Sequence, residues 1–383
     1  MSGKKKRWSY LFLVVMIGIT FFVLIRNFEF GDALRVLADA DYRWVAMALL
    51  LMLLYIFLEG ESIRVICRTL GARFSPFRGF VYSAVDIYFS AVTPSATGGA
   101  PLMMMYMYND GVSYAKSSVV VLLNTMMYTV SMVVLAAVSL IICPFILMED
   151  SLFFRICLGI GTCFSAGLIT LCALGIFHTV WLRRAGNFLI RVGHRLRILR
   201  NPEKLSEKLN RVCEEYSVCA QVLRRHPDVG VKAFFLNLGQ RAAYFCVAYM
   251  AYLALGFRGN AFFLLFGIQA VATMAVYSFP IPGAVGASEA MFLILYDRVY
   301  LEDERVAAML LTRGISYYLT VLFCALLTMV YHICSTQRKK RQVVHLESIE
   351  APPARNGRLI PADQPDTTDK TNSEDNTGKD LKS

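Results

Sequence analysis

The chain has 383 residues, 56% of them apolar and only 17% charged, with a mean hydropathy of +0.51. A soluble protein needs more polar surface than this composition supplies, so we predict a polytopic membrane protein. The net charge of +11 comes from basic residues that flank apolar segments, where they indicate topology, and we expect no nucleic-acid partner.

The ten cysteines lie mostly within apolar runs and form no CxxC pair, which is typical of buried thiols that behave as small hydrophobes. The five histidines are dispersed, and neither an HExxH motif nor a clustered set of carboxylates occurs. We therefore expect no metal site and no cofactor.

The first apolar segment, residues 9–25, follows a basic run, a composition also found in secretory signals. The only A-x-A triplet, Ala38–Ala40, lies too far beyond the apolar run for ordinary cleavage, so we expect a retained helix whose N-terminus is cytoplasmic. A second span is predicted at residues 44–58. The arginines that follow it, from Arg64 to Arg78, place its end in the cytoplasm.

Residues 79–108 are mostly apolar but are interrupted by Val92–Pro101, which reads VTPSATGGAP. Each apolar half has about 12 residues, too few to cross the hydrocarbon core alone. We therefore predict a re-entrant hairpin that enters from the cytoplasm and has this motif at its tip. Full spans are predicted at residues 117–143 and 153–177, with an outside loop between them.

Residues 178–228 contain eleven Lys or Arg and five Asp or Glu, an excess that places this segment in the cytoplasm. Two interpretations remain open for it. It is either an amphipathic helix that lies on an anionic membrane surface or a solvated helical linker whose charge only sets topology.

The second half of the chain repeats the pattern. After a span at residues 229–255, the apolar residues 261–300 are interrupted by Phe279–Ala290, which reads FPIPGAVGASEA, and a last span follows at residues 306–331. The polar tail, residues 336–383, lacks the apolar content to fold, and we expect it to be disordered.

The two interruptions precede their following spans by similar lengths but enter from opposite sides, although their residues align poorly. Discontinuous helices of inverted repeats meet near the bilayer midplane and line a substrate path. We therefore predict an all-α polytopic membrane domain at residues 1–335, with about six full transmembrane helices and two re-entrant broken-helix hairpins in an inverted-repeat arrangement.

The two interruptions are the first candidate binding elements. Backbone that leaves a helix inside hydrocarbon persists only where protein or a polar cavity satisfies its hydrogen bonds. A half-helix that begins there presents free N–H groups and a positive dipole end to a phosphate or carboxylate. Tight turns that pack against neighbours are the alternative explanation of the glycines. The candidate substrate-binding residues are Thr97, Gly98, Gly99, Gly283, Gly286 and Ser288.

Ionisable residues within the spans are the second signal. A mid-span charge costs about 2.5–3.5 kcal/mol and usually faces a polar interior with a partner. Arg241 and Arg313 are the basic candidates, and Asp86 and Glu289, one in each hairpin, are the acidic ones. These four residues either bind a lipid head group, with its phosphate on the arginines and any amine on the acids, or form structural ion pairs with one another.

Four stretches of this sequence resemble one known family. They are TPSATGGAP, YMYNDGVSYA, FPIPGAVGASEAMF and TRGISYYL, and the resemblance is to the flippase-like membrane domain of the lysylphosphatidylglycerol synthase and multiple peptide resistance factor group. It covers roughly residues 5–335. Many members carry a glycine pair where this chain has Gly283 and Ala284. The resemblance implies a bacterial inner-membrane protein that moves or handles an aminoacylated or otherwise modified phospholipid.

In full-length relatives, a soluble domain transfers lysine from lysyl-tRNA to phosphatidylglycerol. About 50 polar residues follow the last predicted span, too few for such a domain, and a lipid flippase is therefore our leading hypothesis. A phosphatidylglycerol lysyltransferase that contributes to resistance against cationic peptides is the alternative, and a membrane scaffold without transport is a third. Expected partners are a phospholipid and the anionic membrane surface, with a separate aminoacyltransferase as a further candidate.

Overall fold

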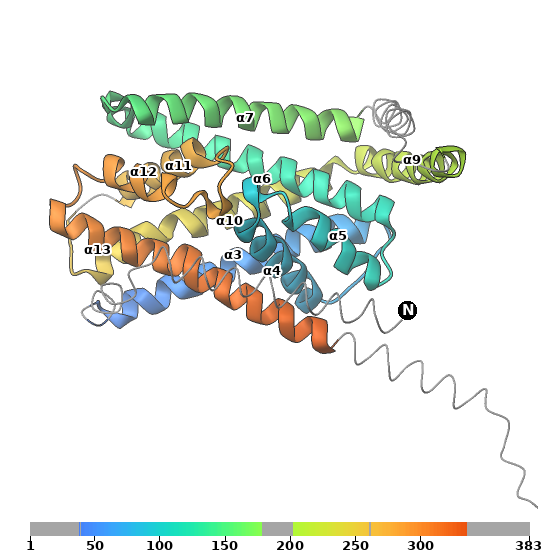
Figure 1. Cartoon of the computed structure of the whole chain (residues 1–383), viewed down its shortest axis with the longest axis horizontal. Helices are drawn as coiled ribbons and strands as arrows, with labels where there is room; N and C mark the ends of the chain where they lie inside the picture. The colour runs from blue at the N-terminus through green and yellow to red at the C-terminus, as the bar shows by residue number, and fades with distance from the viewer. Residues whose placement is uncertain (1–37, 39, 178–201, 260–261, 335–383) are drawn as a thin grey trace, which may run out of the picture. The chain divides into compact units, whose positions relative to one another are not determined.

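The computed structural model describes residues 38, 40–177, 202–259 and 262–334. The predicted first helix, the beginning of the basic segment and the predicted disordered tail lie outside these residues. All regular structure within the described ranges is helical (Figure 1). The chain separates into two units, Met1–Cys334 and Ser335–Ser383, and only the first contains described residues.

The described helices follow one another through the chain with short connections. The α-helices are α3 (Tyr42–Thr69), α4 (Pro76–Val92), α5 (Gly99–Asn109), α6 (Tyr114–Ile142), α7 (Leu152–Phe177), α9 (Pro202–Arg225), α10 (Pro227–Ala254), α11 (Phe262–Val276), α12 (Ala287–Leu295) and α13 (Glu302–Arg313). Short 3₁₀ turns lie at Pro94–Ala96, Pro144–Met148 and Pro282–Ala284, and a π-helical turn, Gly314–Leu319, follows α13. Helix continues from there to residue 334, and we call residues 302–334 the last helix.

Four helices in the described ranges are long and apolar enough to cross a membrane: Tyr42–Thr69, Tyr114–Ile142, Leu152–Ile176 and Glu304–Cys334. This confirms the prediction of an all-helical membrane protein. Helix α10 is equally long at 28 residues but is not among the four. Its centre carries Asn237, Gln240 and Arg241, which lower its hydropathy.

Local signals explain where several helices begin. The Asp41 side chain accepts a hydrogen bond from the backbone N–H of Arg43 at the start of α3. Ser75 caps α4 in the same way, and Pro76 occupies the first position of that helix, where no N–H is needed. Ser113 caps α6.

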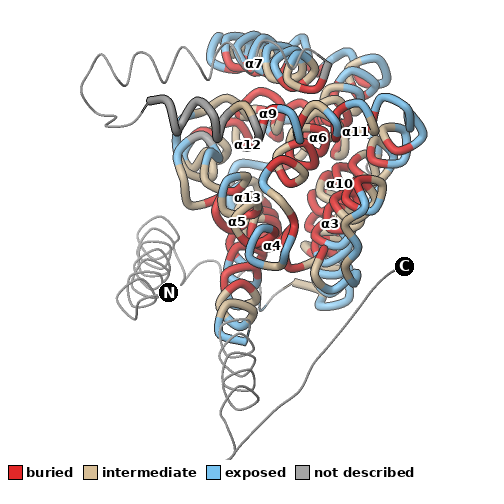
Figure 2. The backbone as a smooth tube through the Cα atoms, turned by 90° about the vertical axis from the view of Figure 1, so that its right-hand side faces the viewer, coloured by how far each residue is buried: buried red, intermediate tan, exposed pale blue. Residues whose placement is uncertain are grey.

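Helices α3 and α10 pack against each other along much of their length and form the centre of the bundle, with α6 against α10 and α4 against α3. The α3–α4 contact is a backbone contact, because a Cβ on Gly60 would lie 2.6 Å from the carbonyl carbon of Gly79. Figure 2 shows burial where these helices meet and exposure along the outer side of α7. The exposed side chains of α7 include Phe153, Ile156, Ile160 and Leu171, an apolar surface suited to lipid.

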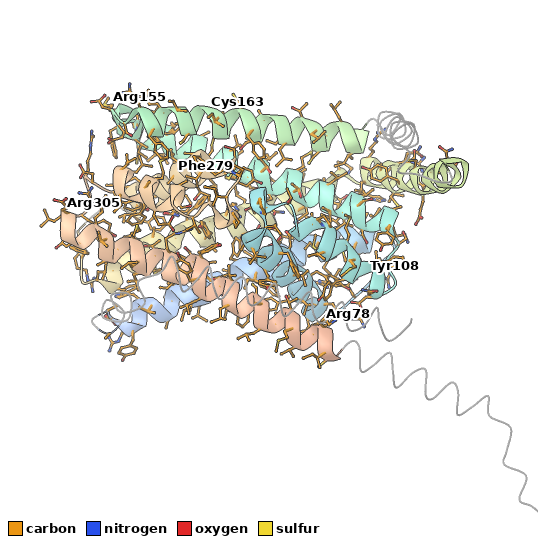
Figure 3. The ribbon with its side chains drawn as sticks, in the orientation of Figure 1. Arg78, Tyr108, Arg155, Cys163, Phe279 and Arg305 are labelled. Carbon is orange, nitrogen blue, oxygen red and sulfur yellow. The ribbon has the colours of Figure 1, made fainter. Side chains whose placement is uncertain are left out.

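The ends of the helices separate into two groups. Arg155 and Arg305 lie at one end of the bundle, and Arg78 and Tyr108 lie at the other (Figure 3). The predicted topology requires this separation, because it assigns the first pair to one side of the membrane and the second pair to the opposite side.

Helix α9 contains the described part of the predicted basic segment. Its apolar face packs on protein: Tyr216 donates a hydrogen bond to the carbonyl of Gly175 at 2.9 Å, and Cys213 and Cys219 are buried. Ser113, before α6, donates a hydrogen bond to the Glu215 side chain. The face of α9 that does not pack on protein is therefore mainly the polar one.

Candidate functional site

The two predicted interruptions begin with the same backbone conformation and diverge after it, since Gly98 has φ −84° and Gly286 has φ +84°. We call residues 93–98 the first break and residues 281–286 the second break. Thr93 has φ −107° and ψ 145°, and Ile281 has φ −102° and ψ 137°. A proline then opens a one-turn 3₁₀ helix in each break. Each turn ends at an alanine with positive φ, 53° at Ala96 and 49° at Ala284, and a new α-helix follows.

The shared entry conformation reveals a residue pattern that the sequence comparison missed. At a constant offset the first break and the second break both read P-x-A-x-G. The matched residues are Pro94, Ala96 and Gly98 in the first break and Pro282, Ala284 and Gly286 in the second. The two 3₁₀ turns also contact each other, so the breaks meet in the folded chain.

The first break is closed by its own side chains. The N–H of Gly98 donates to Oγ1 of Thr93 at 2.9 Å, and that hydroxyl donates to the carbonyl of Phe89 at 2.6 Å. A Cβ on Gly98 would lie 2.5 Å from Cγ2 of Thr93. Gly99 packs directly against Asp86, while Thr97 is exposed and donates to the carbonyl of Pro94. Close packing therefore explains both glycines.

The second break is held by an ion pair from the last helix. Nε of Arg313 lies 3.0 Å from Oε1 of Glu289, and its Nη2 donates to the carbonyl of Gly283 at 3.2 Å. Glu289 also accepts the N–H of Gly286 at 2.6 Å, and Ser288 donates to the carbonyl of Ala284 at 2.9 Å. Of the alternatives for the four ionisable candidates, Arg313 and Glu289 thus adopt the ion pair.

Tyr317, in the π-helical turn, connects the two breaks. Its hydroxyl donates to the carbonyl of Ala91, just before the first break, at 3.1 Å. Its ring lies 4.6 Å from the guanidinium carbon of Arg313 and fills the space that a side chain on Gly283 would need. Isolated π-helical turns are frequent at functional sites. The sequence stretch TRGISYYL contains this residue, but its role depends on contacts that only the fold creates.

A ladder of polar side chains joins the central helices. Asn237, Gln240 and Arg241 are spaced to share one face of α10, and each donates to a side chain of α3. The pairs are Asn237 with Ser62 at 2.9 Å, Gln240 with Glu59 at 3.0 Å, and Arg241 with Tyr55 at 3.1 Å.

Arg241 is a buried cation, only 3% exposed, that is held by aromatic rings. Its guanidinium carbon lies 3.7 Å from the ring centre of Tyr128 and within 6 Å of the rings of Tyr55 and Tyr244. Within the described ranges, no carboxylate lies within ion-pair distance of it, and its Nε has no hydrogen-bond partner. Arg241 therefore keeps one donor for a further acceptor.

A cavity of about 210 Å³ with both polar and apolar lining contains this arginine and residues of both breaks. Phe279, labelled in Figure 3, lies at its edge. None of the described residues that line it is acidic. Its polar lining consists of Tyr55, Ser90, Tyr128, Arg241, Tyr244, Thr273, Tyr277, Ser316, Tyr317 and Thr320, and Ala96, Gly283 and Ala284 come from the breaks. A small cleft beside it contains Ser288 and Arg313.

Asp86 does not pair with either arginine in the described structure. Its carboxyl group forms a hydrogen bond with the carboxyl group of Glu59, which is 3% exposed. Sequence reasoning missed Glu59 because the predicted second span ended at residue 58, whereas α3 continues to Thr69. An acidic residue that continues the periodicity of an apolar helix is the signal that could have found it.

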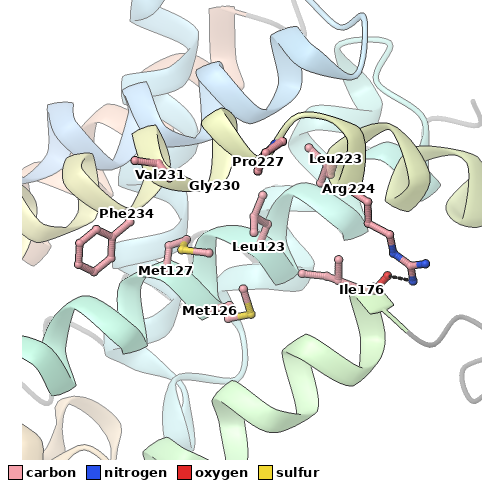
Figure 4. Close-up of a pocket in the computed structure, with 10 residues that line it drawn as sticks. All are labelled: Leu123, Met126, Met127, Ile176, Leu223, Arg224, Pro227, Gly230, Val231 and Phe234. Atoms are coloured by element: carbon pink, nitrogen blue, oxygen red, sulfur yellow. Dashed lines mark hydrogen bonds between the residues drawn. The ribbon is translucent and has the colours of Figure 1, made fainter.

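A second cavity, of about 390 Å³, lies among α6, α7, α9 and α10 (Figure 4). It is lined mainly by apolar side chains such as Leu123, Met127 and Phe234. Arg224 lies at its edge and donates to the carbonyl of Ile176 at 2.9 Å. This lining suits hydrocarbon, whereas the cavity around Arg241 suits a polar head group.

Long apolar helices and broken helices that meet beside a buried arginine define an integral membrane protein with an internal polar site. The chain matches the model of the family described as "Lysylphosphatidylglycerol synthase TM region" over residues 10–324, and it therefore belongs to that family. The resemblance noted in the sequence is confirmed. No curated protein matches the chain.

Proposed function

We propose that the protein moves a phospholipid between the leaflets of a membrane and binds the lipid phosphate at Arg241. The observation that carries this proposal is the free Nε of Arg241 inside a cavity lined by both breaks. A buried arginine is costly unless a partner satisfies its charge and its donors. Phosphate supplies both, because its oxygens accept charge-assisted hydrogen bonds from guanidinium groups.

The lining of the cavity favours an anionic head group. Several tyrosine and threonine hydroxyls line the same cavity as Arg241 and can bind phosphate or glycerol oxygens. No described residue of the lining is acidic. A lysyl amine would find no carboxylate there, since Glu289 is already paired with Arg313. The proposed substrate is therefore a phospholipid with net negative charge, such as phosphatidylglycerol.

The broken helices support the architecture predicted from the sequence. Helices α4, α5, α11 and α12 have 17, 11, 15 and 9 residues, and each is shorter than the roughly 20 residues that cross a bilayer. We propose that α4–α5 and α11–α12 are the two re-entrant hairpins of an inverted repeat with about six full spans around them. Movement of one hairpin against the other at the meeting breaks would open the cavity to alternate sides.

The proposed orientation puts both chain ends and Tyr108 in the cytoplasm and Asp150 outside. Single-cysteine labelling in a cysteine-free background tests it. Reagent confined to the outside should modify a cysteine at position 150 and spare one at position 108. The reverse labelling would invert the orientation.

Lipid movement should depend on the charge of Arg241. A charge-assisted hydrogen bond contributes about 1.5–3 kcal/mol, so Arg241→Ala should slow movement of labelled phosphatidylglycerol in proteoliposomes at least about tenfold. Arg241→Lys should recover only part of the rate, because an ammonium lacks the planar guanidinium fork. Arg43→Ala removes an exposed arginine of α3 and is the matched control. A well-folded Arg241→Ala protein with the wild-type rate would rule out the phosphate site.

A phosphatidylglycerol lysyltransferase is the second candidate, because the family description names a synthase. The transport proposal expects that purified chain given lysyl-tRNA and phosphatidylglycerol forms no lysyl lipid by itself. Product formed by the chain alone would favour the transferase, whereas product that requires a second protein would agree with a transporter and a separate aminoacyltransferase.

A further inference from the structure

A buried acid, Glu59, and a partly buried one, Asp86, meet one helical turn away from the proposed phosphate site. Glu59 on α3 and Asp86 on α4 form a hydrogen bond through their carboxyl groups. Oε2 of Glu59 also accepts hydrogen bonds from Ser83 at 2.9 Å and from Gln240 at 3.0 Å. The close crossing of α3 and α4 at Gly60 brings the two acids together.

A hydrogen bond between two carboxyl groups contains a proton, because an ionised carboxylate only accepts. The pair therefore carries one proton and one negative charge in this geometry. Two adjacent carboxylates repel each other inside a protein, which favours one shared proton. One further proton would make the pair neutral.

Gln240 provides a hydrogen-bond acceptor for a carboxyl group that binds that second proton. This residue is fully buried, and its side-chain carbonyl Oε1 has no hydrogen-bond partner. A half-turn of its amide exchanges the N–H donor that now faces Glu59 for this acceptor. A protonated Glu59 could then donate to Gln240, so this oxygen can accept a hydrogen bond when the pair binds a second proton.

The pair is connected to the cavity by both helices that carry it. Tyr55 lies one turn from Glu59, Ser90 lies one turn from Asp86, and both line the cavity around Arg241. The charge of Arg241 also acts on Glu59. The other titratable groups that interact with the pair from packed elements are Tyr55 on α3, Tyr128 on α6, Tyr277 after α11 and Cys324 in the last helix.

We propose that Glu59 and Asp86 form a proton-binding site that couples lipid movement to a proton gradient; this inference rests on the proposed function. With one proton, the pair is negative and offsets the charge of Arg241. Binding of a second proton removes that negative charge, so Arg241 attracts the lipid phosphate more strongly. The proton and the anionic lipid then move together, and both leave on the other side.

The test uses proteoliposomes with labelled phosphatidylglycerol and an imposed pH difference. If one proton accompanies each lipid, a difference of one pH unit should change the steady-state ratio of lipid between leaflets by about tenfold. Glu59→Gln and Asp86→Asn should abolish this dependence. Glu61→Gln, two residues away on α3 and paired with Arg64, should retain it. Wild-type movement that ignores the pH difference, or follows a sodium gradient instead, would overturn the coupling.

Infrared spectroscopy of the purified protein gives a second readout that needs no transport. A pH titration should show a carbonyl band of a protonated carboxyl group, and this band should disappear in Glu59→Gln and persist in Glu61→Gln. An identical band in all three proteins would overturn the proton site. If no lipid moves but the band behaves as expected, the proposed function fails while the proton site stands.

Discussion

The two breaks begin alike but differ in what holds them. In the first break, Thr93 satisfies Gly98 within one short stretch of chain. In the second, Glu289 satisfies Gly286 and is itself held by Arg313, which lies 24 residues further along the chain. The proline and the alanine of the P-x-A-x-G pattern thus occupy matching positions of the two 3₁₀ turns. The surrounding residues determine how much each break depends on the rest of the fold.

The two breaks also adjoin different charged groups. The first break adjoins the acid pair of Glu59 and Asp86, and the second adjoins the balanced pair of Arg313 and Glu289. Arg241 lies in the cavity between them without an ion-pair partner in the described residues. The first break is held by its own residue Thr93, whereas the second is held by Arg313 of the last helix. A substitution outside the break should therefore destabilise the second break but not the first.

The largest effect should follow from removing that support. Arg313→Ala leaves Glu289 without its cation in a mostly buried position, and we expect a loss of about 3 kcal/mol of unfolding free energy and low abundance. Membrane abundance and thermal unfolding in detergent measure it. Adding Glu289→Gln removes the unpaired charge but keeps an acceptor for the N–H of Gly286, so it should recover much of the loss. Arg155→Ala breaks an exposed pair with Asp150 and should cost less than about 1 kcal/mol. An abundant, stable Arg313→Ala protein would show that the ion pair is not structural.

The next effect should come from the glycine that contacts Tyr317. Gly283 has φ +60°, which costs about 1–2 kcal/mol for an L-residue, and a side chain there would collide with the Tyr317 ring. Gly283→Ala should therefore destabilise more than Gly71→Ala, because Gly71 has φ +76° but open space around it. Thermal unfolding of both variants measures the difference. Equal losses would mean that Tyr317 moves away freely.

A smaller effect is expected in the first break. Thr93→Val keeps the shape but leaves the N–H of Gly98 without an acceptor, at a cost of about 1–3 kcal/mol. Thr93→Ser retains the hydroxyl and should be close to wild type. Thr97→Val removes an exposed hydroxyl and its solvent-accessible hydrogen bond to the carbonyl of Pro94, and it is the control for position. Equal stability of the valine and serine variants at position 93 would show that this break does not need its local cap.

The smallest effect should come from the residue that joins the breaks. Tyr317→Phe removes one hydrogen bond to Ala91 but keeps the ring over Arg313, so we expect about 1 kcal/mol. Tyr114→Phe, at an exposed tyrosine, should change nothing measurable. A loss as large as that of Arg313→Ala would mean that the hydroxyl, rather than the ion pair, holds the breaks together.

Much of the fold could be predicted from the sequence because apolar length and composition control membrane insertion. The helices at residues 114–142, 152–177 and 227–254 lie within a few residues of the predicted spans. Proline and glycine indicated both interruptions, because proline cannot continue a helix and glycine destabilises one. The predicted end of the second span at residue 58 was wrong, since α3 runs to Thr69 and buries Glu59 and Ser62.

The site was predicted only in part. Arg241, Arg313, Asp86 and Glu289 stood out because charge is expensive within apolar helices, but their partners depend on tertiary packing. The fold pairs Arg313 with Glu289, pairs Asp86 with the unpredicted Glu59, and surrounds Arg241 with tyrosines. Tyrosines are common in apolar spans, so no sequence signal distinguished Tyr128 or Tyr317 from the others.

The central claim is that the cavity between the breaks binds a lipid phosphate at Arg241. The most direct test is an experimental structure of the protein in nanodiscs that contain phosphatidylglycerol, compared with Arg241→Gln prepared in the same way. We expect phosphate density within hydrogen-bond distance of Nε of Arg241 in the wild type and none there in the variant. Phosphate bound at Arg313, or a cavity without lipid density in both proteins, would contradict the account.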